Sequence, residues 1–456
     1  MAHTASHFAS AAAFEDYLDR LGLFHMDLTL ARIESCLSRL GLDTLPYPAI
    51  QVVGTNGKGT TSTLIARMAA AHGLRAGLYT SPHFLHPRER IRFIEPAHTD
   101  TQGATERSDC ISEKAWRDAA NAVHPAQEEE PLTYFEYITV LAAHAFRGAR
   151  VDLAVFEAGL GGRNDATTAL RCPTVCFTRI GLDHTHILGR DLEDVAADKA
   201  AAMPSRGTAL TIRQQETARF ILDREAIKRG TRLLEVRPPQ GMASVAESGN
   251  GSDEPLSPED ALAQLPAMLR ENGRLAIAAW AHLATTHGWP FETDAVRDCV
   301  GRSMLPGRFQ HVYDNDAWFL LDAAHNPQAM EALALSMAEQ GIVPRAVVFA
   351  CLADKDLEAM AAVLAKAMDG TAHVPELPGV ERALPAQDIC RALRNAGLEA
   401  TPHPDTAASL TAACAESEAS KAGARRPVLV CGSLYLLAGF FTLRPNLLGS
   451  ANCGES

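Results

Sequence analysis

The chain of 456 residues carries 42 basic and 55 acidic side chains, a formal net charge of −13, and 47% hydrophobic residues. One domain usually takes about 150 residues, so this length predicts two large domains, and the composition excludes wholesale disorder. The negative charge argues against nucleic-acid binding, and no apolar run approaches the roughly 18 residues of a membrane span. The ten cysteines include no C-x-x-C pair and are predicted to be reduced core residues of a cytoplasmic protein.

The first part of the chain alternates short apolar runs with helical patterns, which is typical of a parallel sheet covered by helices. The region from Leu28 to Leu40 carries its apolar residues on one face and ends at Gly41, which predicts an amphipathic helix. A second helix is expected to end at Gly73, because glycine enters the left-handed cap without strain. Strands are predicted at residues 50–53, 74–80, 151–156 and 174–178.

Two segments differ from this pattern. Residues 95–110 and 238–260 are rich in proline, glycine, serine and acidic residues. Such segments bury little apolar surface, so both are expected to be exposed, mobile insertions.

A second alternating set begins after Leu305-Pro306-Gly307-Arg308, a sequence that suggests an interdomain hinge. Apolar strands are predicted at residues 318–321, 346–350 and 427–430, with a helix over residues 330–340 between the first two. We therefore expect one domain of residues 1–300 and a second of residues 301–456.

The sharpest local signal is the segment Gly54-Thr55-Asn56-Gly57-Lys58-Gly59-Thr60-Thr61, between a predicted strand and a helix. Glycines let backbone N–H groups approach phosphate oxygens, the helix N-terminus adds its positive dipole end, and a lysine reaches terminal phosphates. The segment departs from G-x-x-x-x-G-K-[ST], because Val52 occupies the first glycine position and Gly59 follows the lysine. Its place between a strand and a helix still favours phosphate binding over a plain glycine turn.

An acidic residue ends another predicted strand. Glu157 follows the apolar run Val151–Phe156 and precedes a glycine-rich turn. Ligands of parallel sheets bind at the carboxyl ends of the strands, and a carboxylate beside a phosphate loop usually holds Mg²⁺. A lone acid at a strand end is more often a solvated terminus, but the glycine loop upstream favours the metal role.

The segment Asp183-His184-Thr185-His186 follows a further strand. Two histidines at this spacing suggest zinc, yet neither a cysteine nor a third histidine stands at ligand spacing. His184 would be an unusual ligand for a hard cation such as Mg²⁺, and Lys199 by residue type alone is a solvated helix lysine. Residue chemistry alone gives neither residue a firm role.

Polar residues also follow the strands of the second half. They are Arg308, Asp322, His325-Asn326, Asp354-Lys355-Asp356 and Gly432-Ser433. Each is weak alone, but together they line the strand ends of a second doubly wound sheet that could close over the first.

With these motifs in order, the chain resembles the folylpolyglutamate synthase and dihydrofolate synthase branch of the Mur ligases. The matching segments are Asp27–Arg32, Gly54–Thr61, Thr80–His83, Glu89–Ile91, Thr133–Glu136, Glu157–Thr167, Asp183–Thr185, Lys199, Pro306–Phe309, Leu321–Pro327 and Gly432–Tyr435. The resemblance implies two doubly wound α/β domains: an N-terminal P-loop ATPase domain of the Mur-ligase type and a smaller, Rossmann-like C-terminal domain.

The resemblance also implies roles for individual residues. ATP would be bound by Thr55, Asn56, Gly57, Lys58, Gly59, Thr60, Asn272, Arg308 and Asp322. Ser81 and Glu157 would bind one Mg²⁺, and His184 would contact a second. Lys199 matches a lysine that is carbamylated in the family. The residues implied to be catalytic are Lys58, Glu157, His184, Lys199 and His325. The pterin substrate would be contacted by Asp27, Leu28, Thr29, Leu30, Thr133, Tyr134, Phe135, Glu136, Asn164, Asp165 and Ala166.

The implied reaction is the ATP-dependent ligation of L-glutamate to 7,8-dihydropteroate and to tetrahydrofolate polyglutamates, through an acyl phosphate, with release of ADP and phosphate. Its partners would be small molecules, with neither nucleic acid nor membrane, and the enzyme would be a cytoplasmic monomer. The alternatives are a monofunctional folylpolyglutamate synthase or another Mur-type amide ligase, such as a peptidoglycan ligase. A regulatory NTPase switch and a non-catalytic binding module are weaker alternatives.

Overall fold

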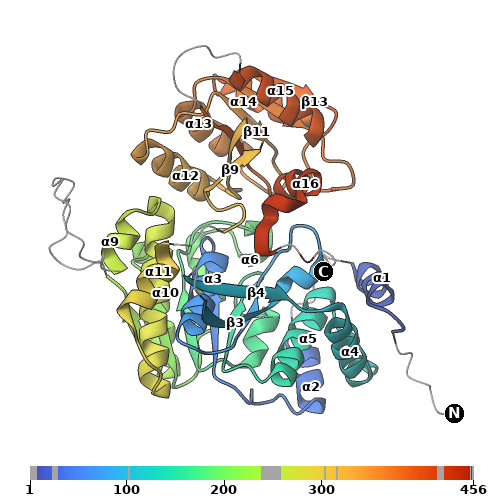
Figure 1. Ribbon diagram of the computed structural model, residues 1–456, viewed down its shortest axis with the longest axis vertical. Coiled ribbons are helices and arrows are strands. Elements are labelled where there is room, and N and C mark those ends of the chain that lie inside the picture. Colours follow the sequence, from blue (N-terminus) through green and yellow to red (C-terminus); the bar gives the residue numbers. More distant parts are fainter. Residues whose placement is uncertain are drawn as a thin grey trace.

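The computed structural model describes residues 8–22, 29–100, 103–237, 258–301, 305–314, 317–418, 426–451 and 453. Its strands form two sheets, on which the N-terminal domain and the C-terminal domain are built. Figure 1 shows the two domains stacked one above the other, with the C-terminal domain in orange and red. The predicted fold, two doubly wound α/β domains, is confirmed. Among the helices of the described ranges, none has the length and hydropathy that a membrane crossing needs.

The N-terminal domain is built on a sheet of eight strands in the order β4-β3-β2-β5-β1-β6-β7-β8. The strands are β1 (Ala49–Val53), β2 (Ala76–Tyr79), β3 (Ile91–Asp100), β4 (Gly103–Cys110), β5 (Leu153–Glu157), β6 (Thr174–Phe177), β7 (Thr208–Thr211) and β8 (Arg232–Glu235). All neighbours are parallel except β3, which runs antiparallel to both β2 and β4. The central strands β1 and β5 are buried along their whole length, which explains their nearly continuous apolar sequences.

Helices cover both faces of this sheet. One face packs against α1 (Ala11–Leu21), α2 (Ala31–Arg39), α4 (Glu113–Val123) and α5 (Tyr134–Ala149). The other face packs against α3 (Lys58–Ala71), α9 (Pro258–Ala263), α10 (Ala267–His287) and α11 (Thr293–Gly301). At the β6–β7 side, α7 (Leu192–Ala200) and α8 (Glu216–Arg229) add a further cluster, and the short α6 (Thr185–Leu188) precedes them.

The C-terminal domain has six strands in the order β13-β12-β11-β14-β10-β9. They are β9 (Gln310–Asp314), β10 (Ala317–Leu321), β11 (Ala346–Phe349), β12 (Thr371–Pro375), β13 (Ala400–His403) and β14 (Val428–Cys431), with only β9 antiparallel to its neighbour. One face is covered by α12 (Pro327–Glu339), α13 (Leu357–Ala367) and α14 (Ala386–Asn395), and the other by α15 (Thr406–Glu418) and α16 (Leu434–Leu443).

The predicted apolar strands are confirmed within two residues at each end. The predicted amphipathic helix before the first strand is α2, with Ile33 and Leu37 buried, and Gly41 follows it with φ +64°. Gly73 takes φ +84° after α3, as its role in a left-handed cap predicts. The strands β7, β8, β12 and β13 were not predicted, because each is only four or five residues long and carries polar residues.

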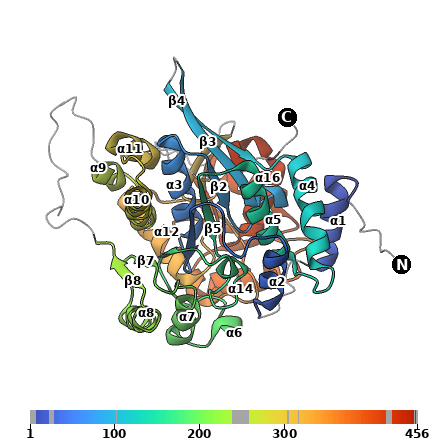
Figure 2. The same ribbon diagram turned by 90° about the horizontal axis from the view of Figure 1, so that it is seen from below.

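Residues 95–110, predicted to be an exposed, mobile insertion, carry strand structure in the last part of β3 and in β4. Residues 103–110 form β4, which pairs with β3 in an irregular antiparallel ladder and projects beyond the sheet in Figure 2. The backbone of this polar segment therefore finds its hydrogen-bond partners in β3 rather than in water. Most of the other predicted insertion, residues 238–257, lies outside the described residues, and α9 begins at Pro258.

The prediction that all ten cysteines are reduced is wrong. Cys110, the last residue of β4, forms a disulfide with Cys453 near the C-terminus. The two residues are 343 positions apart, and the fold brings their Cα atoms to 5.7 Å. Cys176, Cys351 and Cys431 are buried without a disulfide, as predicted.

The packing of α10 against α3 gives a test of the fold. Trp280 of α10 is fully buried in the cluster that also contains Leu64 and Met68 of α3. Trp280→Ala should lower the free energy of unfolding by about 3–5 kcal/mol, because it leaves a large cavity. The control Phe220→Ala removes a side chain that is 64% exposed and should change stability by less than about 0.5 kcal/mol. Equal losses in urea denaturation of the two variants would contradict the packing.

Candidate active site

The site lies where the carboxyl ends of β1, β5 and β6 face the C-terminal domain. The glycine loop follows β1 and opens α3, with Gly57 at the N-cap in the left-handed region at φ +92°. A Cβ atom on Gly57 would lie 2.2 Å from Oδ1 of Asn272, so the loop and α10 touch at this point. Thr55 joins the loop to the segment after β6, because its hydroxyl donates to the carbonyl of Gly181 at 2.9 Å.

Lys58 stands at the first residue of α3 and turns back over the loop. Its Nζ donates to the carbonyl oxygens of Gly54 and Thr55, each at 3.2 Å. Gly59 and Thr60 follow in the first turn of the helix. A Cβ atom on Gly59 would lie 3.4 Å from Oε2 of Glu157, so a side chain there would crowd the carboxylate. The strand, loop and helix thus follow one another as the sequence predicts, and phosphate binding by this loop stays a prediction.

Glu157 ends β5 and is only 4% exposed. Its Oε2 accepts a hydrogen bond from the backbone N–H of Ser81 at 3.0 Å. Burial raises the pKa of Glu157, and the charge of Lys58 and the Ser81 hydrogen bond oppose that rise. The two residues predicted to bind one Mg²⁺ therefore lie together, at the glycine loop.

Lys199 is buried in α7 rather than solvated, with 4% of its surface exposed. Its Nζ donates to the carbonyl of Gly54 at 2.9 Å, which places it beneath the glycine loop. Burial, together with the positive charge of Lys58, lowers the pKa of Lys199 to about 7. A neutral amine is therefore accessible at this position near neutral pH.

Asp183 connects the two domains. Its carboxylate lies 2.5 Å from Nζ of Lys355, accepts from Nδ2 of Asn326 at 3.1 Å and lies 3.5 Å from Nε2 of His325. Burial alone would raise the pKa of Asp183, but the hydrogen bond from His325 and the charges of His184 and Lys355 outweigh it and lower the pKa. Asp183 belongs to the N-terminal domain, and its three partners belong to the C-terminal domain.

The glycine loop itself also contacts the C-terminal domain. Nδ2 of Asn56 donates to Oδ1 of Asn326 at 3.3 Å and to Oε1 of Gln328 at 3.1 Å. His184 has φ +50°, and its imidazole faces Asp354 of the C-terminal domain at 3.8 Å. Burial lowers the pKa of His184 to about 4, so the ring is neutral at pH 7.

The start of α10 forms a third junction. Arg270 pairs with Glu339 of α12 at 2.6 Å, and Glu271 pairs with Arg179 after β6 at 2.5 Å. The next residue, Asn272, lies against the glycine loop. Three consecutive residues thus contact the C-terminal domain, the N-terminal sheet and the predicted nucleotide site.

Arg308 and Asp322 lie side by side at the entrance to the C-terminal domain. Asp322 follows β10 and accepts from the backbone N–H groups of Phe309 and Ala324, each at 2.8 Å. Burial raises the pKa of Asp322, and the charge of Arg308 opposes it. The charge of Arg308 also opposes the rise in the pKa of Glu157, and binding of the nucleotide by Arg308 and Asp322 stays a prediction.

The predicted substrate residues form a second group around the start of α5. Thr133 caps α5 in a capping box with Glu136, whose carboxylate is 3.1 Å from Nη2 of Arg32. Phe135 packs against Gly159, where a Cβ atom would lie 2.5 Å from the ring. Asp27 and Leu28 lie outside the described residues, and Thr29 and Leu30 precede α2. The other residues predicted to contact the substrate are Tyr134, Asn164, Asp165 and Ala166, and all four lie in the described part of the chain.

Asp165 is buried and already holds the turn after Gly159. Its carboxylate accepts from the N–H of Leu160 at 2.8 Å and from the N–H and hydroxyl of Thr167 at 3.0 and 2.5 Å. Burial raises its pKa, and the bonds from Thr167 and Leu160 oppose the rise. Its contact with a substrate remains a prediction.

Sequence reasoning did not assign a role to Lys355 or Gln328. Lys355 stands in Asp354-Lys355-Asp356 after β11, a strand-end position that gave a weak signal. Only 4% of the Lys355 side chain is exposed, so this lysine is buried rather than on the surface. Gln328 had no sequence signal, because its role depends on how the two domains meet.

Comparison with known proteins supports the family resemblance that the sequence motifs indicate. Residues 307–434 match the family described as Mur ligase, glutamate ligase domain. A dihydrofolate synthase/folylpolyglutamate synthase of Escherichia coli K12 is 32% identical over 435 residues, which is 94% of each chain. A folylpolyglutamate synthase of Lacticaseibacillus casei is 28% identical over 425 residues, covering 92% of this chain and 94% of the relative.

Solved structures are similar over nearly the whole chain. Escherichia coli FolC in complex with DHPP and ADP has a TM-score of 0.79 and 28% identity, covering 97% of this chain and 99% of that one. A bifunctional folylpolyglutamate synthase/dihydrofolate synthase with Mn, AMPPNP and L-glutamate bound has a TM-score of 0.75 and 27% identity, covering 97% of this chain and 100% of that one.

The fold, the glycine loop and the two-domain site define an ATP-dependent ligase of the Mur type. Within that class, the chain belongs to the dihydrofolate synthase/folylpolyglutamate synthase family. The residues fit the nucleotide and the divalent cation of this class. The glycine loop is a cradle that a side chain on Gly57 or Gly59 would fill, and Glu157 and Ser81 offer the oxygen ligands that Mg²⁺ prefers.

The nucleotide site can be tested with two variants. Lys58→Ala and Glu157→Gln should each lower the rate of ADP formation by about 10²–10³-fold, the usual cost of removing one preorganised charge from a transition state. Circular dichroism and thermal melting check that both variants fold. Correctly folded variants with near-normal turnover would show that the nucleotide lies elsewhere.

Proposed function

We propose that this chain ligates L-glutamate to 7,8-dihydropteroate and to tetrahydrofolate polyglutamates, with conversion of ATP to ADP and phosphate. The observation that carries the proposal is the single site formed by both domains: the glycine loop and Glu157 on one side, Lys355 and His325 on the other, joined through Asp183. The structures of Escherichia coli FolC with DHPP and ADP, and of a bifunctional folylpolyglutamate synthase/dihydrofolate synthase with L-glutamate, support it.

The chemistry explains why two domains are needed. A carboxylate is a poor acyl donor, so ATP must first convert it to an acyl phosphate, which the amine of glutamate then attacks. Lys58 neutralises charge on the transferred phosphoryl group. Ser81 and Glu157 would hold one Mg²⁺ and His184 would contact a second, and these ions would supply further charge neutralisation. Holding two substrates together contributes up to roughly 7–11 kcal/mol, and closure of the domains excludes water from the labile intermediate.

The division of labour follows the two sheets. We assign ATP and pterin binding to residues 1–300 and the glutamate-ligase half to residues 301–456. The match of residues 307–434 to the glutamate ligase domain supports this assignment.

We further propose a monomer that works in the cytoplasm on small molecules alone. Both halves of the site belong to one chain, so no second copy is needed to complete it. The reaction consumes ATP, which cells hold in the cytoplasm. The net charge of −13 does not favour nucleic acid or an anionic membrane surface.

Lys199 is proposed to be carbamylated, which would convert a buried cation beneath the glycine loop into an anion. Its pKa of about 7 means that acid pH protonates the amine and blocks reaction with CO₂, whereas the neutral form dominates above pH 7. Enzyme stripped of CO₂ should therefore lose activity and regain it with bicarbonate, more completely at pH 8 than at pH 6. Lys199→Ala should be nearly inactive, with partial rescue by short carboxylic acids. A fully active Lys199→Arg enzyme would contradict the proposal.

The bifunctional assignment is tested by offering dihydropteroate and tetrahydrofolate separately with glutamate and measuring ADP release. Both should support turnover. Asp165→Ala should weaken the use of dihydropteroate by about 5–150-fold, because a buried donor pair of the pterin would lose its acceptor. Nucleotide binding should not change.

The control for this variant is Thr167→Val, which removes one hydrogen bond to Asp165 but keeps the carboxylate. If Thr167→Val impairs dihydropteroate use as much as Asp165→Ala, Asp165 acts only by holding its turn. Extension of tetrahydrofolate without any turnover of dihydropteroate would leave a monofunctional folylpolyglutamate synthase, the activity named for the Lacticaseibacillus casei relative.

A further inference from the structure

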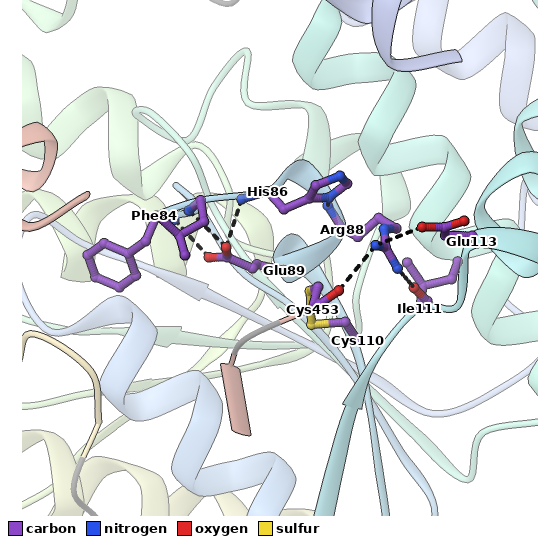
Figure 3. Close-up of a disulfide and its surroundings, with 9 residues drawn as sticks. Phe84, His86, Arg88, Glu89, Cys110, Ile111, Glu113 and Cys453 are labelled. Carbon is purple, nitrogen blue, oxygen red and sulfur yellow. Dashed lines mark hydrogen bonds and ion pairs between the residues drawn. A yellow bond between two sulfur atoms is a disulfide. The ribbon is translucent and has the colours of Figure 1, made fainter. Parts of the chain in front are cut away.

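The disulfide between Cys110 and Cys453 joins the two domains outside the active site. Cys110 ends β4 at the edge of the N-terminal sheet, and Cys453 follows the last elements of the C-terminal domain. Figure 3 shows the disulfide beside the loop that leads from β2 to β3. None of the residues assigned to catalysis takes part in it.

The C-terminal segment is anchored in the C-terminal domain just before it reaches Cys453. Phe440 and Phe441 of α16 are fully buried against the sheet, and Leu448 is 1% exposed in the same cluster. Cys453 follows Leu448 by five positions. Five residues span at most about 17 Å, so an intact disulfide keeps the anchor at Leu448 within a short distance of Cys110.

This link is a covalent connection between the domains in addition to the chain that enters β9. A body joined to another at one point can swing and twist, whereas a body joined at two points turns only about the line between them. We propose that Cys110 and Cys453 form a reversible redox site, closed and opened by thiol–disulfide exchange, that restricts how far the two domains can separate.

Contacts around the disulfide connect it to the loop that begins with Ser81, a residue predicted to bind Mg²⁺. Arg88 donates from Nη2 to the carbonyl of Cys453 at 3.2 Å and from Nη1 to the carbonyl of Ile111 at 3.4 Å, and it pairs with Glu113 at 3.4 Å. Arg88 thus fixes the backbone on both sides of the disulfide. It belongs to η1 (Pro87–Arg90), at the end of the loop that begins with Ser81.

The same loop contacts α16. The carboxylate of Glu89 accepts from the N–H groups of Phe84 and Leu85, each at 2.8 Å, and so fixes the loop's shape. The ring of Phe84 lies 5.0 Å from that of Phe441 in an edge-to-face contact. If the C-terminal segment becomes more mobile, the contact between Phe84 and Phe441 weakens. The loop that positions Ser81 against Glu157 then becomes more mobile as well.

The Cys110–Cys453 pair is accessible for redox chemistry. Cys110 and Cys453 are both half-buried, and Cys110 lines an open cavity of about 540 Å³ together with Arg75 and Lys114. By contrast, burial raises the pKa of Cys36, Cys172 and Cys351 to about 12, which suppresses their reactive thiolate forms. An exchanging thiol therefore reaches the disulfide before it reaches the core.

The exchange balances as follows. In the closing direction, the thiols of Cys110 and Cys453 lose two protons and two electrons as the S–S bond forms, and a glutathione disulfide accepts both and becomes two thiols. In the opening direction, a dithiol reductant attacks the Cys110–Cys453 bond through a mixed disulfide and is itself oxidised.

The test uses the full chain after equilibration with glutathione disulfide or with dithiothreitol, and differential alkylation with peptide mass mapping reports the state of Cys110 and Cys453. Reduction should increase amide hydrogen exchange in residues 81–90 and 434–443. This readout needs no substrate and stands even if the proposed ligase activity fails.

The kinetic arm rests on the proposed function. Reduction should raise the KM for glutamate by about 3–10-fold, because the C-terminal half of the site is less often held in place. Cys453→Ser should behave like the reduced enzyme under both conditions. Cys414→Ser, a change of a half-buried cysteine in α15 that forms no disulfide, should keep the full redox response.

Several outcomes would overturn the proposal. They are a disulfide that does not form with glutathione disulfide, a disulfide that dithiothreitol cannot open in the folded protein, and hydrogen exchange that is equal in both states. A redox response that persists in Cys453→Ser would do the same.

Discussion

The buried carboxylate of Asp183 is the contact on which the two-domain site depends. It comes from the N-terminal domain, yet its partners Lys355, Asn326 and His325 all come from the C-terminal domain. A buried carboxylate pays a large desolvation cost unless charged and polar groups surround it. The backbone N–H of His184 is a partner within the same domain, but the side-chain partners Lys355, Asn326 and His325 arrive only when the domains meet. The domain arrangement therefore completes the ion pair, and the ion pair favours that arrangement.

Close approach is the second constraint on the site. A Cβ atom would collide with Thr178 at Gly54 and with Asn272 at Gly57, so the loop needs glycine at both positions. The absence of a side chain at Gly57 lets α10 pack directly against the loop. Lys199 donates to the backbone carbonyl of Gly54, and burial at this position lowers its pKa.

Much of the fold and part of the candidate site could be predicted from the sequence, because their signals are local. The glycine loop, Glu157 and the apolar strands are local patterns, and the topology of a parallel sheet brings their ends together. Gln328 and the Cys110–Cys453 pair were not accessible, because each depends on residues more than a hundred positions away. β4 was misjudged since its composition is that of a loop, and only its pairing with β3 makes it a strand. The assigned substrate residues around α5 rest on resemblance and on their shared location.

The three consecutive residues at the start of α10 have a thermodynamic consequence. Arg270 pairs with Glu339 of α12, Glu271 pairs with Arg179, and Asn272 lies against the glycine loop. All three residues lie within one helical turn. A displacement of this turn would move all three contacts together, which would link occupancy of the loop to the position of the C-terminal domain. Linkage is reciprocal: if nucleotide binding favours domain closure by a given free energy, closure strengthens nucleotide binding by the same free energy. The Arg270–Glu339 pair is partly exposed, so ionic strength sets how strong this coupling is.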